Sequence, residues 1–406
     1  MNRRFQYAVV STSTCLVALL LFGAVRGRSA SNNEQPYRHL AVFSEVLSKI
    51  KSDYVEEPDL KGVTAGALNG LLESIDPFGS YLSADQFKQY QKAKAANKGD
   101  VGLILARRAG YVSIVSVTPG SSASKNNLST GDVIEAINGV GTRDMPLAYA
   151  QMLLAGDPGT TIEVTVLRLR NPEPAKISLT RAAAKYSDVT LKMLDNQIAF
   201  IQTYSVDAAH VDQIAARVKE AEKNGAKKII LDLRNVAHGQ PADGLRLANL
   251  FMGSGSLGSL SGQKTARQEF AADAKVQITK LPLAVLTNRG TAGAAEIAAS
   301  ALLDSKRAEL VGERTYGYAG VQKEITLDDG SALILTTAKY NAASGKAISE
   351  TGVVPNHPVI DTSDNDDDED EDGVVVDPGK KKIPANPAAP APEDAPLKKA
   401  IEILSK

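Results

Sequence analysis

The sequence predicts an α+β multidomain protein, with a helical N-terminal region, a small β-rich domain and an α/β layered core. Apolar residues recur at three- and four-residue steps in the first region, which predicts amphipathic helices. Short β-like runs separated by turns follow, and strands then alternate with helices. The chain has 406 residues, 43% of them apolar, which is enough for two or three domains with real cores.

The composition excludes several classes of function. A formal net charge of −1 gives no overall field that would favour nucleic acid or an anionic membrane. The sequence has no Trp and few aromatic residues, which disfavours a platform for stacked bases. One cysteine rules out an intramolecular disulfide and a cysteine-built zinc site, and four scattered histidines offer no metal-ligand pair. We therefore expect no metal and no cofactor.

Residues 1–30 are predicted to be a signal peptide or an uncleaved signal anchor. Arg3 and Arg4 precede a mostly apolar run, 7–25, of roughly 19 residues, which is just long enough to span a bilayer as a helix. Small residues after this run permit cleavage, although neighbouring arginines make the site poor. A buried core helix is the alternative. We expect the rest of the chain to act in the periplasm or elsewhere outside the cytoplasmic membrane, and to contact the inner membrane if the segment is retained.

Residues 35–95 are predicted to be the helical N-terminal region. One apolar helix face comprises Leu40, Phe43, Leu47, Ile50 and Tyr54, and a second begins with Ala65, Leu68, Leu71 and Leu72. The turn-forming sequence Asp76-Pro-Phe-Gly ends the second helix. Ser83 is expected to cap another short helix.

Residues 97–182 are predicted to form the small β-rich domain. Its β-like runs are 102–106, 111–117, 133–137, 161–168 and 176–180, with one helix at 146–154. Residues 183–360 are predicted to form the layered core. Its expected strands are 198–202, 228–233, 281–287, 309–312, 322–327 and 332–338, and its expected helices are 207–224, 243–252 and 294–303.

The C-terminal segment divides into a linker and a helix. Residues 361–372 carry nine acidic residues and no basic one, and the segment up to 394 continues with prolines among alanines. Such a composition buries too little apolar surface to fold, so 361–394 are predicted to be an acidic, then Pro/Ala-rich linker. Residues 395–406 are predicted to form a last short amphipathic helix.

Four motifs in the β-rich domain resemble a PDZ domain. They are Val101-Gly-Leu, Val117-Thr-Pro-Gly-Ser-Ser-Ala, Leu128-Ser-Thr-Gly-Asp-Val-Ile-Glu-Ala-Ile-Asn-Gly and, after a helix, Gly156-Asp-Pro-Gly-Thr. PDZ domains bind the C-terminus of a peptide as an added strand. The resemblance implies that backbone N–H groups of Val101, Gly102 and Leu103 hold the terminal carboxylate. It places Leu147, Ala150 and Leu154, together with Leu103, around the last apolar side chain. A packed spacer or lid is the alternative for this domain.

The remaining motifs resemble the carboxyl-terminal processing peptidases, or tail-specific proteases, over nearly the whole mature chain. They include Asp76-Pro-Phe-Gly-Ser-Tyr-Leu, Ile230-Leu-Asp-Leu-Arg-Asn, Val311-Gly-Glu-Arg-Thr-Tyr-Gly and Gly352-Val-Val-Pro-Asn. This family implies a serine-type peptidase in which a serine attacks the peptide and a lysine is the general base. Its fold would be the α/β layered core predicted above.

The residues that should carry this chemistry are replaced. Aligned on Glu296-Ile297, the position of the serine is Gly293, and the position of the lysine is Tyr318. Gln322, which supports the lysine in the family, is retained. Without a nucleophile and its base, covalent catalysis is lost. Thr291 is the candidate for a rebuilt nucleophile, with Tyr318 as its base, although Thr291 is expected to be the N-cap of the next helix.

The oxyanion region departs from the family as well. The resemblance places it at His238, Gly239 and Ala294, where the family has Asn-Pro-Gly-Gly before the nucleophile segment. A side chain at 238 restricts a backbone that glycine leaves free. His238 is otherwise interpreted as a turn residue that faces solvent.

The sequence therefore leaves the protein's status as an enzyme open. The favoured hypothesis is a pseudoenzyme, an exported or membrane-anchored relative of these peptidases that binds C-terminal peptides of exported proteins through its PDZ domain. An active relative is a further expected partner. The alternatives are a serine-type endopeptidase with a rebuilt site and an envelope scaffold. No contact with nucleic acid is expected.

Overall fold

The computed structural model describes residues 34–96, 99–108, 110–143, 145–168, 171–349, 351–360 and 394–406. The predicted signal segment and most of the predicted acidic linker lie outside these residues. The chain divides into two compact units at Ala67. Among the described residues, no helix combines the length and apolar character that crossing a membrane requires.

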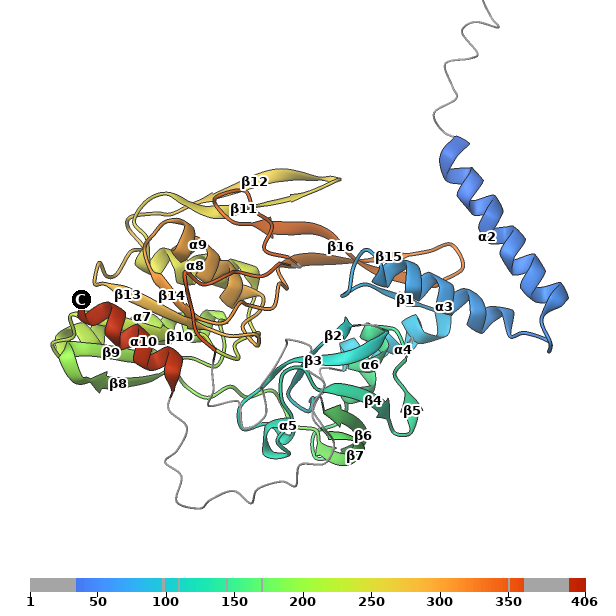
Figure 1. Cartoon of the computed structure of the whole chain (residues 1–406), viewed down its shortest axis with the longest axis horizontal. Helices are drawn as coiled ribbons and strands as arrows, with labels where there is room; N and C mark the ends of the chain where they lie inside the picture. Colours follow the sequence, from blue (N-terminus) through green and yellow to red (C-terminus); the bar gives the residue numbers. More distant parts are fainter. Residues whose placement is uncertain are drawn as a thin grey trace, which may run out of the picture. The chain divides into compact units, whose positions relative to one another are not determined.

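The first unit contains α2 (Glu34–Asp53) and the start of α3 (Leu60–Glu73) (Figure 1). Its predicted apolar face is largely exposed, since Leu40 is 59% and Phe43 is 40% exposed. Tyr54 lies just beyond the end of α2 rather than within it. The helix predicted from the three- and four-residue spacing is present, whereas most of the apolar side chains on its predicted face are exposed to solvent.

The PDZ-like region is a sheet of order β2-β3-β4-β6-β7, with β5 paired to β4 and two helices. Its elements are β2 (Leu103–Arg108), β3 (Tyr111–Val117), α5 (Ser122–Lys125), β4 (Val133–Ile137), β5 (Val140–Gly141), α6 (Leu147–Leu154), β6 (Thr161–Arg168) and β7 (Asn171–Thr180). Alternate strand residues such as Val112, Ile114 and Ile134 are buried, as the period of a strand requires. β2 lies at the edge of this sheet.

The core is a six-stranded sheet of order β17-β14-β13-β10-β9-β8, in which only β8 runs antiparallel to its neighbour. The strands are β8 (Thr190–Leu194), β9 (Ile198–Gln202), β10 (Lys228–Asp232), β13 (Leu283–Thr287), β14 (Glu309–Gly312) and β17 (His357–Pro358). The helices are α7 (Ala208–Lys223), α8 (Pro241–Phe251), α9 (Ala294–Asp304) and α10 (Ala395–Ser405), with a short 3-10 turn at Asp195–Gln197.

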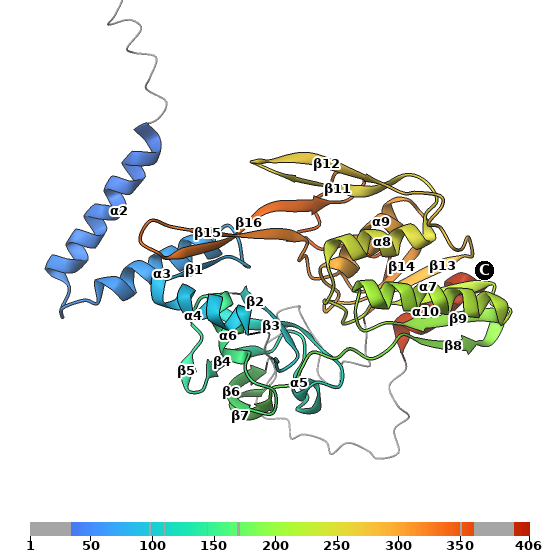
Figure 2. The same cartoon turned by 180° about the vertical axis from the view of Figure 1, so that it is seen from behind.

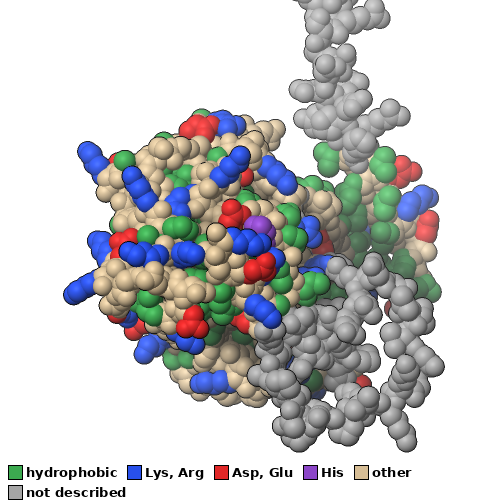
Figure 3. Space-filling view, turned by 60° about the vertical axis from the view of Figure 1, so that its left-hand side comes forward, with side chains coloured by type: hydrophobic (Ala, Val, Ile, Leu, Met, Phe, Trp, Pro, Cys, Tyr) green, Lys and Arg blue, Asp and Glu red, His purple; other side chains and the backbone are tan. Residues whose placement is uncertain are grey.

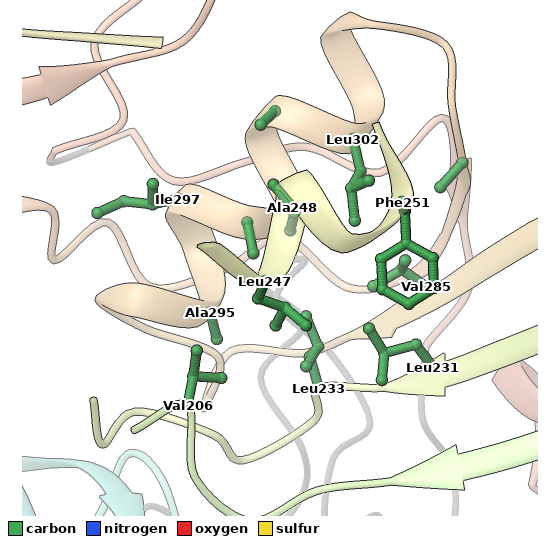
Figure 4. Packing of buried hydrophobic residues seen from close by; sticks show 14 of the residues in the cluster. Val206, Leu231, Leu233, Leu247, Ala248, Phe251, Val285, Ala295, Ile297 and Leu302 are labelled. Atoms are coloured by element: carbon green, nitrogen blue, oxygen red, sulfur yellow. The ribbon is translucent and has the colours of Figure 1, made fainter. Parts of the chain in front are cut away.

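Helices cover both faces of this sheet, so the core has three layers. Leu231 and Val285 pack against α8 and α9 through Leu247, Phe251 and Leu302 (Figure 4). The neighbouring residues Ile230 and Ala284 point to the opposite face, where α10 covers them. Accordingly α10 lies in front of the sheet in Figure 1, and α7 lies in front in Figure 2. The predicted last helix is confirmed, and its place on the sheet was not foreseen.

A second, five-stranded sheet joins segments that are far apart in the sequence. It contains β1 (Ser80–Leu82), β11 (Ser256–Gly262), β12 (Thr265–Ala271), β15 (Gly320–Thr326) and β16 (Ala332–Asn341). β1 pairs with β16 through Ser80 and Ile334. The hairpin of β11 and β12 was not predicted, because β12 is mostly exposed and its residues show no apolar alternation. The helix α4 (Ala84–Ala95) follows β1 and begins with the expected Ser83 cap.

Candidate functional site

Gly293 lies at a sharp turn between β13 and α9, where it is the N-cap of the helix. Its φ of 61° and ψ of −122° are a conformation that residues with a side chain rarely adopt. A strained strand-to-helix turn is also how several hydrolases expose a nucleophile. A Cβ placed on Gly293 would meet nothing nearer than 3.6 Å, so the position has space for a side chain and has none.

Tyr318 lies beside this turn. Its Cδ1 atom is 3.9 Å from the position that a Cβ on Gly293 would take. The ring packs against Phe78, with the two ring centroids 4.4 Å apart. Burial raises the pKa of the Tyr318 phenol, and the negative charge of Asp76 raises it further. A phenol that holds its proton so firmly is a poor general base near neutral pH.

Glu296 brings Gly293 and Tyr318 together. Its buried carboxylate accepts hydrogen bonds from the N–H groups of Gly293 at 3.0 Å, Gly317 at 2.5 Å and Tyr318 at 2.7 Å. The Thr315 hydroxyl donates a fourth, at 2.5 Å. Burial raises the pKa of Glu296 to about 7, against these four hydrogen bonds, which favour the charged form. One side chain thus fixes both the start of α9 and the loop before β15.

Gln322 is close to Tyr318 but is bonded elsewhere. Its Nε2 donates to the Phe78 backbone oxygen at 2.7 Å. Gln322 and Tyr318 line a cavity of about 40 Å³ together with Leu147 of α6. The other lining residues are Phe78, Tyr90, Leu105, Ala148, Gln151 and Ile334. One small cavity therefore lies between Leu105 of β2, Leu147 of α6 and the Tyr318 side chain.

The loop after β10 forms the other wall of the corner. A Cβ on Gly239 would lie 2.0 Å from the Val206 oxygen and 3.1 Å from the Ala294 Cβ, so only glycine fits there. His238 precedes it, with Nδ1 2.9 Å from Ser205 Oγ and its ring stacked on Tyr186 at 4.3 Å. These contacts differ from the interpretation of His238 as a simple turn residue, although its side chain is 43% exposed.

The surroundings of His238 shift its pKa and give it a hydrogen-bond partner. Burial lowers the pKa of the imidazole, and the nearby Asp207 carboxylate opposes this effect. Asp207 accepts a hydrogen bond from Ser205 Oγ at 2.8 Å, so the serine hydroxyl lies between the acid and the imidazole. Ser205 itself is completely buried. The hydrogen bonds of Ser205 to Asp207 and His238 therefore hold the loop after β10 in place. The Ser205 hydroxyl does not line the cavity beside Tyr318.

Thr291 is not the N-cap that the sequence predicted. Its hydroxyl donates to the Leu233 oxygen at 2.8 Å and accepts from the Asn288 N–H at 3.1 Å. The side chain is completely buried, and its bonds tie the turn before α9 to the end of β10. Gly293 takes the N-cap position, and the Glu296 carboxylate accepts its N–H, which is the bond that the N3 residue contributes to a capping box. Gly293 has no side chain to make the other bond of the box.

The residues expected around the PDZ pocket are close together but packed. Leu147, Ala150 and Leu154 are each at most 3% exposed and pack in one cluster with Leu105. Val101 is in the same cluster, and Leu103 packs at its margin. The groove between β2 and α6 is thus closed by its own side chains.

The sequence analysis did not identify Asp100, whose side chain bonds to the Val101-Gly-Leu loop of the PDZ domain. The Asp100 Oδ1 atom accepts the Gly102 N–H at 2.8 Å, so this N–H group already has a carboxylate partner. An aspartate two residues before a glycine is a known signal for such a local turn, and it could have been recognised in the sequence. The structuring role of Glu296 had no comparable local signal. Within the described residues, no group of three or more His, Cys, Asp or Glu side chains could hold a metal.

Two family models match the two folded domains of the chain. A family model described as peptidase family S41 matches residues 197–359, and a PDZ domain model matches 113–168. The fold is thus a PDZ domain combined with an S41 peptidase core. The chain belongs to the family of carboxyl-terminal processing peptidases.

Individual relatives cover most of the chain. It is 31% identical over 356 residues to the carboxy-terminal processing protease CtpA of Bacillus subtilis, covering 86% of this chain and 75% of the relative. It is 29% identical over 333 residues to a carboxy-terminal-processing protease of Bartonella bacilliformis, covering 80% and 76%. A solved photosystem II D1 C-terminal processing protease matches with a TM-score of 0.65 and 25% identity, covering 79% of this chain and 92% of that one.

Proposed function

We propose that this protein is a member of its family that binds peptides and does not hydrolyse them. The observation that carries the proposal is the turn at Gly293, where a strained backbone suited to a nucleophile has no side chain. The group beside it, Tyr318, holds its proton too firmly to replace a lysine base. A covalent mechanism needs both groups.

A rebuilt nucleophile is the less favoured alternative. The Thr291 hydroxyl is buried and hydrogen-bonded to two backbone groups inside the protein. Ser205 has a histidine partner but is completely buried and is shared with Asp207. Neither hydroxyl lines the cavity at Tyr318, so neither would reach a peptide there.

A peptide segment would bind along the edge of the PDZ sheet. β2 is an edge strand, and an added strand on such an edge is how PDZ domains hold peptides. The Arg107 N–H at the far end of β2 already donates to the Pro77 oxygen, which limits the addition to the first part of the strand. A cavity of about 40 Å³ accommodates little more than a water molecule, so binding would move α6 away from Tyr318.

We further propose that the bound segments are peptides from the C-terminal ends of exported proteins, whose last residues need not stop at the loop, and that an active relative is a partner. The basic, apolar N-terminal segment supports export or anchoring, with function in the periplasm or another compartment outside the cytoplasmic membrane. Figure 3 shows basic and acidic side chains interspersed over one face, so this face presents no broad field of one sign to attract a ligand. An envelope scaffold would need neither cleavage nor peptide binding.

The test is mass spectrometry of the purified chain incubated with unstructured proteins that have apolar C-termini. We expect intact substrate, part of it recovered bound to the protein. The matched control is Thr291→Ala, which should leave the result unchanged. Specific fragments that disappear in Thr291→Ala or Tyr318→Phe would establish a rebuilt active site instead. Substrate that is neither cut nor bound would favour the scaffold.

A further inference from the structure

The loop that should receive a peptide carboxylate already contains one. The Oδ1 atom of Asp100 lies 2.8 Å from the Gly102 nitrogen and accepts its N–H. This N–H belongs to the Val101-Gly-Leu loop, to which the PDZ resemblance assigns the terminal carboxylate. The side chain of Asp100 thus makes a contact that the end of a peptide would otherwise make.

The loop has little freedom to offer this N–H group to anything else. Gly102 has a φ of 85°, and a Cβ there would lie 2.1 Å from the Ser121 side chain. Its oxygen accepts the Thr118 N–H at 2.9 Å, and the Val101 oxygen accepts the Ala123 N–H at 3.1 Å. Backbone hydrogen bonds on both sides therefore hold the loop in the shape that bonds to Asp100.

The position of Asp100 is fixed as well. Its N–H donates to the Ala182 oxygen at 2.9 Å, and its own oxygen accepts the Ala182 N–H at 2.8 Å. The Asp100 side chain is exposed to water, so its charge is solvated without any ligand. Its carboxylate and the Gly102 N–H together form a local Asx-turn at the start of the loop.

The basic residue next to the backbone partner of Asp100 bonds elsewhere. Arg181 precedes Ala182, but its guanidinium donates to the backbone oxygens of Leu153 and Leu154 at 2.9 Å each. Asp207 adds a second negative charge that acts, like Asp100, on Tyr186 and His238. A free peptide carboxylate placed at the loop would be repelled by the like charge of Asp100, because like charges in contact repel each other even near a protein surface.

We propose that Asp100 determines the specificity of the groove, which accepts extended peptide segments without a free carboxylate at the loop. The ligand class is an internal segment, or a C-terminal segment that continues past the loop, recognised by strand addition and by its apolar side chains. A free terminal carboxylate at the loop has to displace or oppose Asp100. This inference rests on the proposed function, since it assumes that a peptide enters the groove beside β2, and it names the part of the peptide that is recognised.

The test compares two forms of one peptide on the full chain. The probe is a short, unstructured peptide with an apolar last residue, labelled at its N-terminus, with either a free acid or an amide at its C-terminus. Fluorescence anisotropy gives the dissociation constant of each. We expect the amide to bind about 10-fold more tightly, the effect of roughly one like-charge contact at the surface. Raising the salt concentration should reduce this ratio.

Two variants separate charge from hydrogen bonding. Asp100→Asn keeps an oxygen that can accept the Gly102 N–H but removes the charge, so both peptides should bind equally well. Asp100→Ala frees the N–H, so the free acid should become the tighter ligand, gaining about 10-fold or more over the wild type. Binding of the amide should change less than about 2-fold in either variant, because its apolar contacts are untouched. Circular dichroism checks that the fold is kept.

The outcomes distinguish the two proposals. Wild-type protein that binds the free acid as tightly as the amide, or more tightly, overturns the specificity of Asp100 and leaves peptide binding intact. A ratio that the variants do not change has the same consequence. If neither peptide binds to any of the three proteins, the proposed peptide binding fails, and the specificity proposal fails with it.

Discussion

Two regions of this protein differ in opposite ways in the side chains that they carry. At the start of α9, the turn has a φ that residues with a side chain rarely adopt, and Gly293 supplies no side chain. At the start of β2, the loop has a glycine with a positive φ, and the Asp100 side chain bonds to its N–H. In both places the backbone is held by hydrogen bonds that do not depend on the side chain at the altered position, so the backbone shape and that side chain can change independently.

The two backbone segments depend on their supporting side chains to different extents. Glu296 is buried and joins four donors from two segments, whereas Asp100 is exposed and makes a single local bond. Buried donors without a partner are expensive, and exposed ones turn to water. The predictions below measure this difference.

The largest effect is expected from Glu296→Ala. The change leaves four buried donors without their acceptor, which should lower the free energy of unfolding by at least about 3 kcal/mol. Urea denaturation of the full chain measures it. The control is Glu269→Ala, whose carboxylate is exposed and pairs only with Arg267 on the surface, and it should change stability by less than about 0.5 kcal/mol. Equal effects would show that Glu296 does not hold the corner together.

A smaller effect is expected from pH. Burial raises the pKa of Glu296 to about 7 in the folded protein, above its ordinary value of 4.5. The folded state then binds more protons than the unfolded state between these values, so this group's contribution to stability falls as pH rises from 4.5 to 7. The expected loss is up to about 3 kcal/mol, and Glu296→Gln should lack it. Denaturation of both proteins across this range measures the difference, and parallel curves would contradict the raised pKa.

The sequence predicted local features, such as helices and their caps, better than contacts between distant segments. The Ser83 cap was predicted, and Ser83 and Gln86 exchange the two bonds of a capping box. A helix was predicted at 207–224, and in α7 the side chains of Val211 and Ile214 are both fully buried. Such features depend on residues a few positions apart, which a sequence reports directly.

Contacts between distant segments could not be predicted in this way. Gln322 was predicted as the residue that supports the base position, and the structure adds that its side chain bonds to the Phe78 oxygen, 244 residues away in the sequence. Glu296 was a marker for alignment, and its role emerged only when the 315–318 loop was found to meet α9. The positions of Gly293 and Tyr318 were predicted through the family resemblance, and the structure adds that the tyrosine ring lies against the vacant position.

A moderate effect is expected from filling that position. Gly293→Ala and Gly293→Ser should each lower the free energy of unfolding by about 1–3 kcal/mol, because a Cβ is strained at a φ of 61° although the space is open. Thermal or urea unfolding of the two variants measures this. Gly110→Ala is a matched control for the backbone, since Gly110 has a φ of 82° and also has open space around it. A much larger loss at 293 than at 110 would mean that steric contact, rather than backbone strain, excludes a side chain there.

The smallest effect on stability is expected from Asp100→Ala. It removes one exposed hydrogen bond, so the free energy of unfolding should fall by only about 0.5–1.5 kcal/mol. Hydrogen exchange at the Gly102 amide is the sharper measurement, because this N–H should exchange faster in Asp100→Ala and near the wild-type rate in Asp100→Asn. If Asp100→Ala were as destabilising as Glu296→Ala, the aspartate would be part of the frame of the loop rather than an addition to it. Its presence would then reflect folding, and the comparison between the two regions would no longer hold.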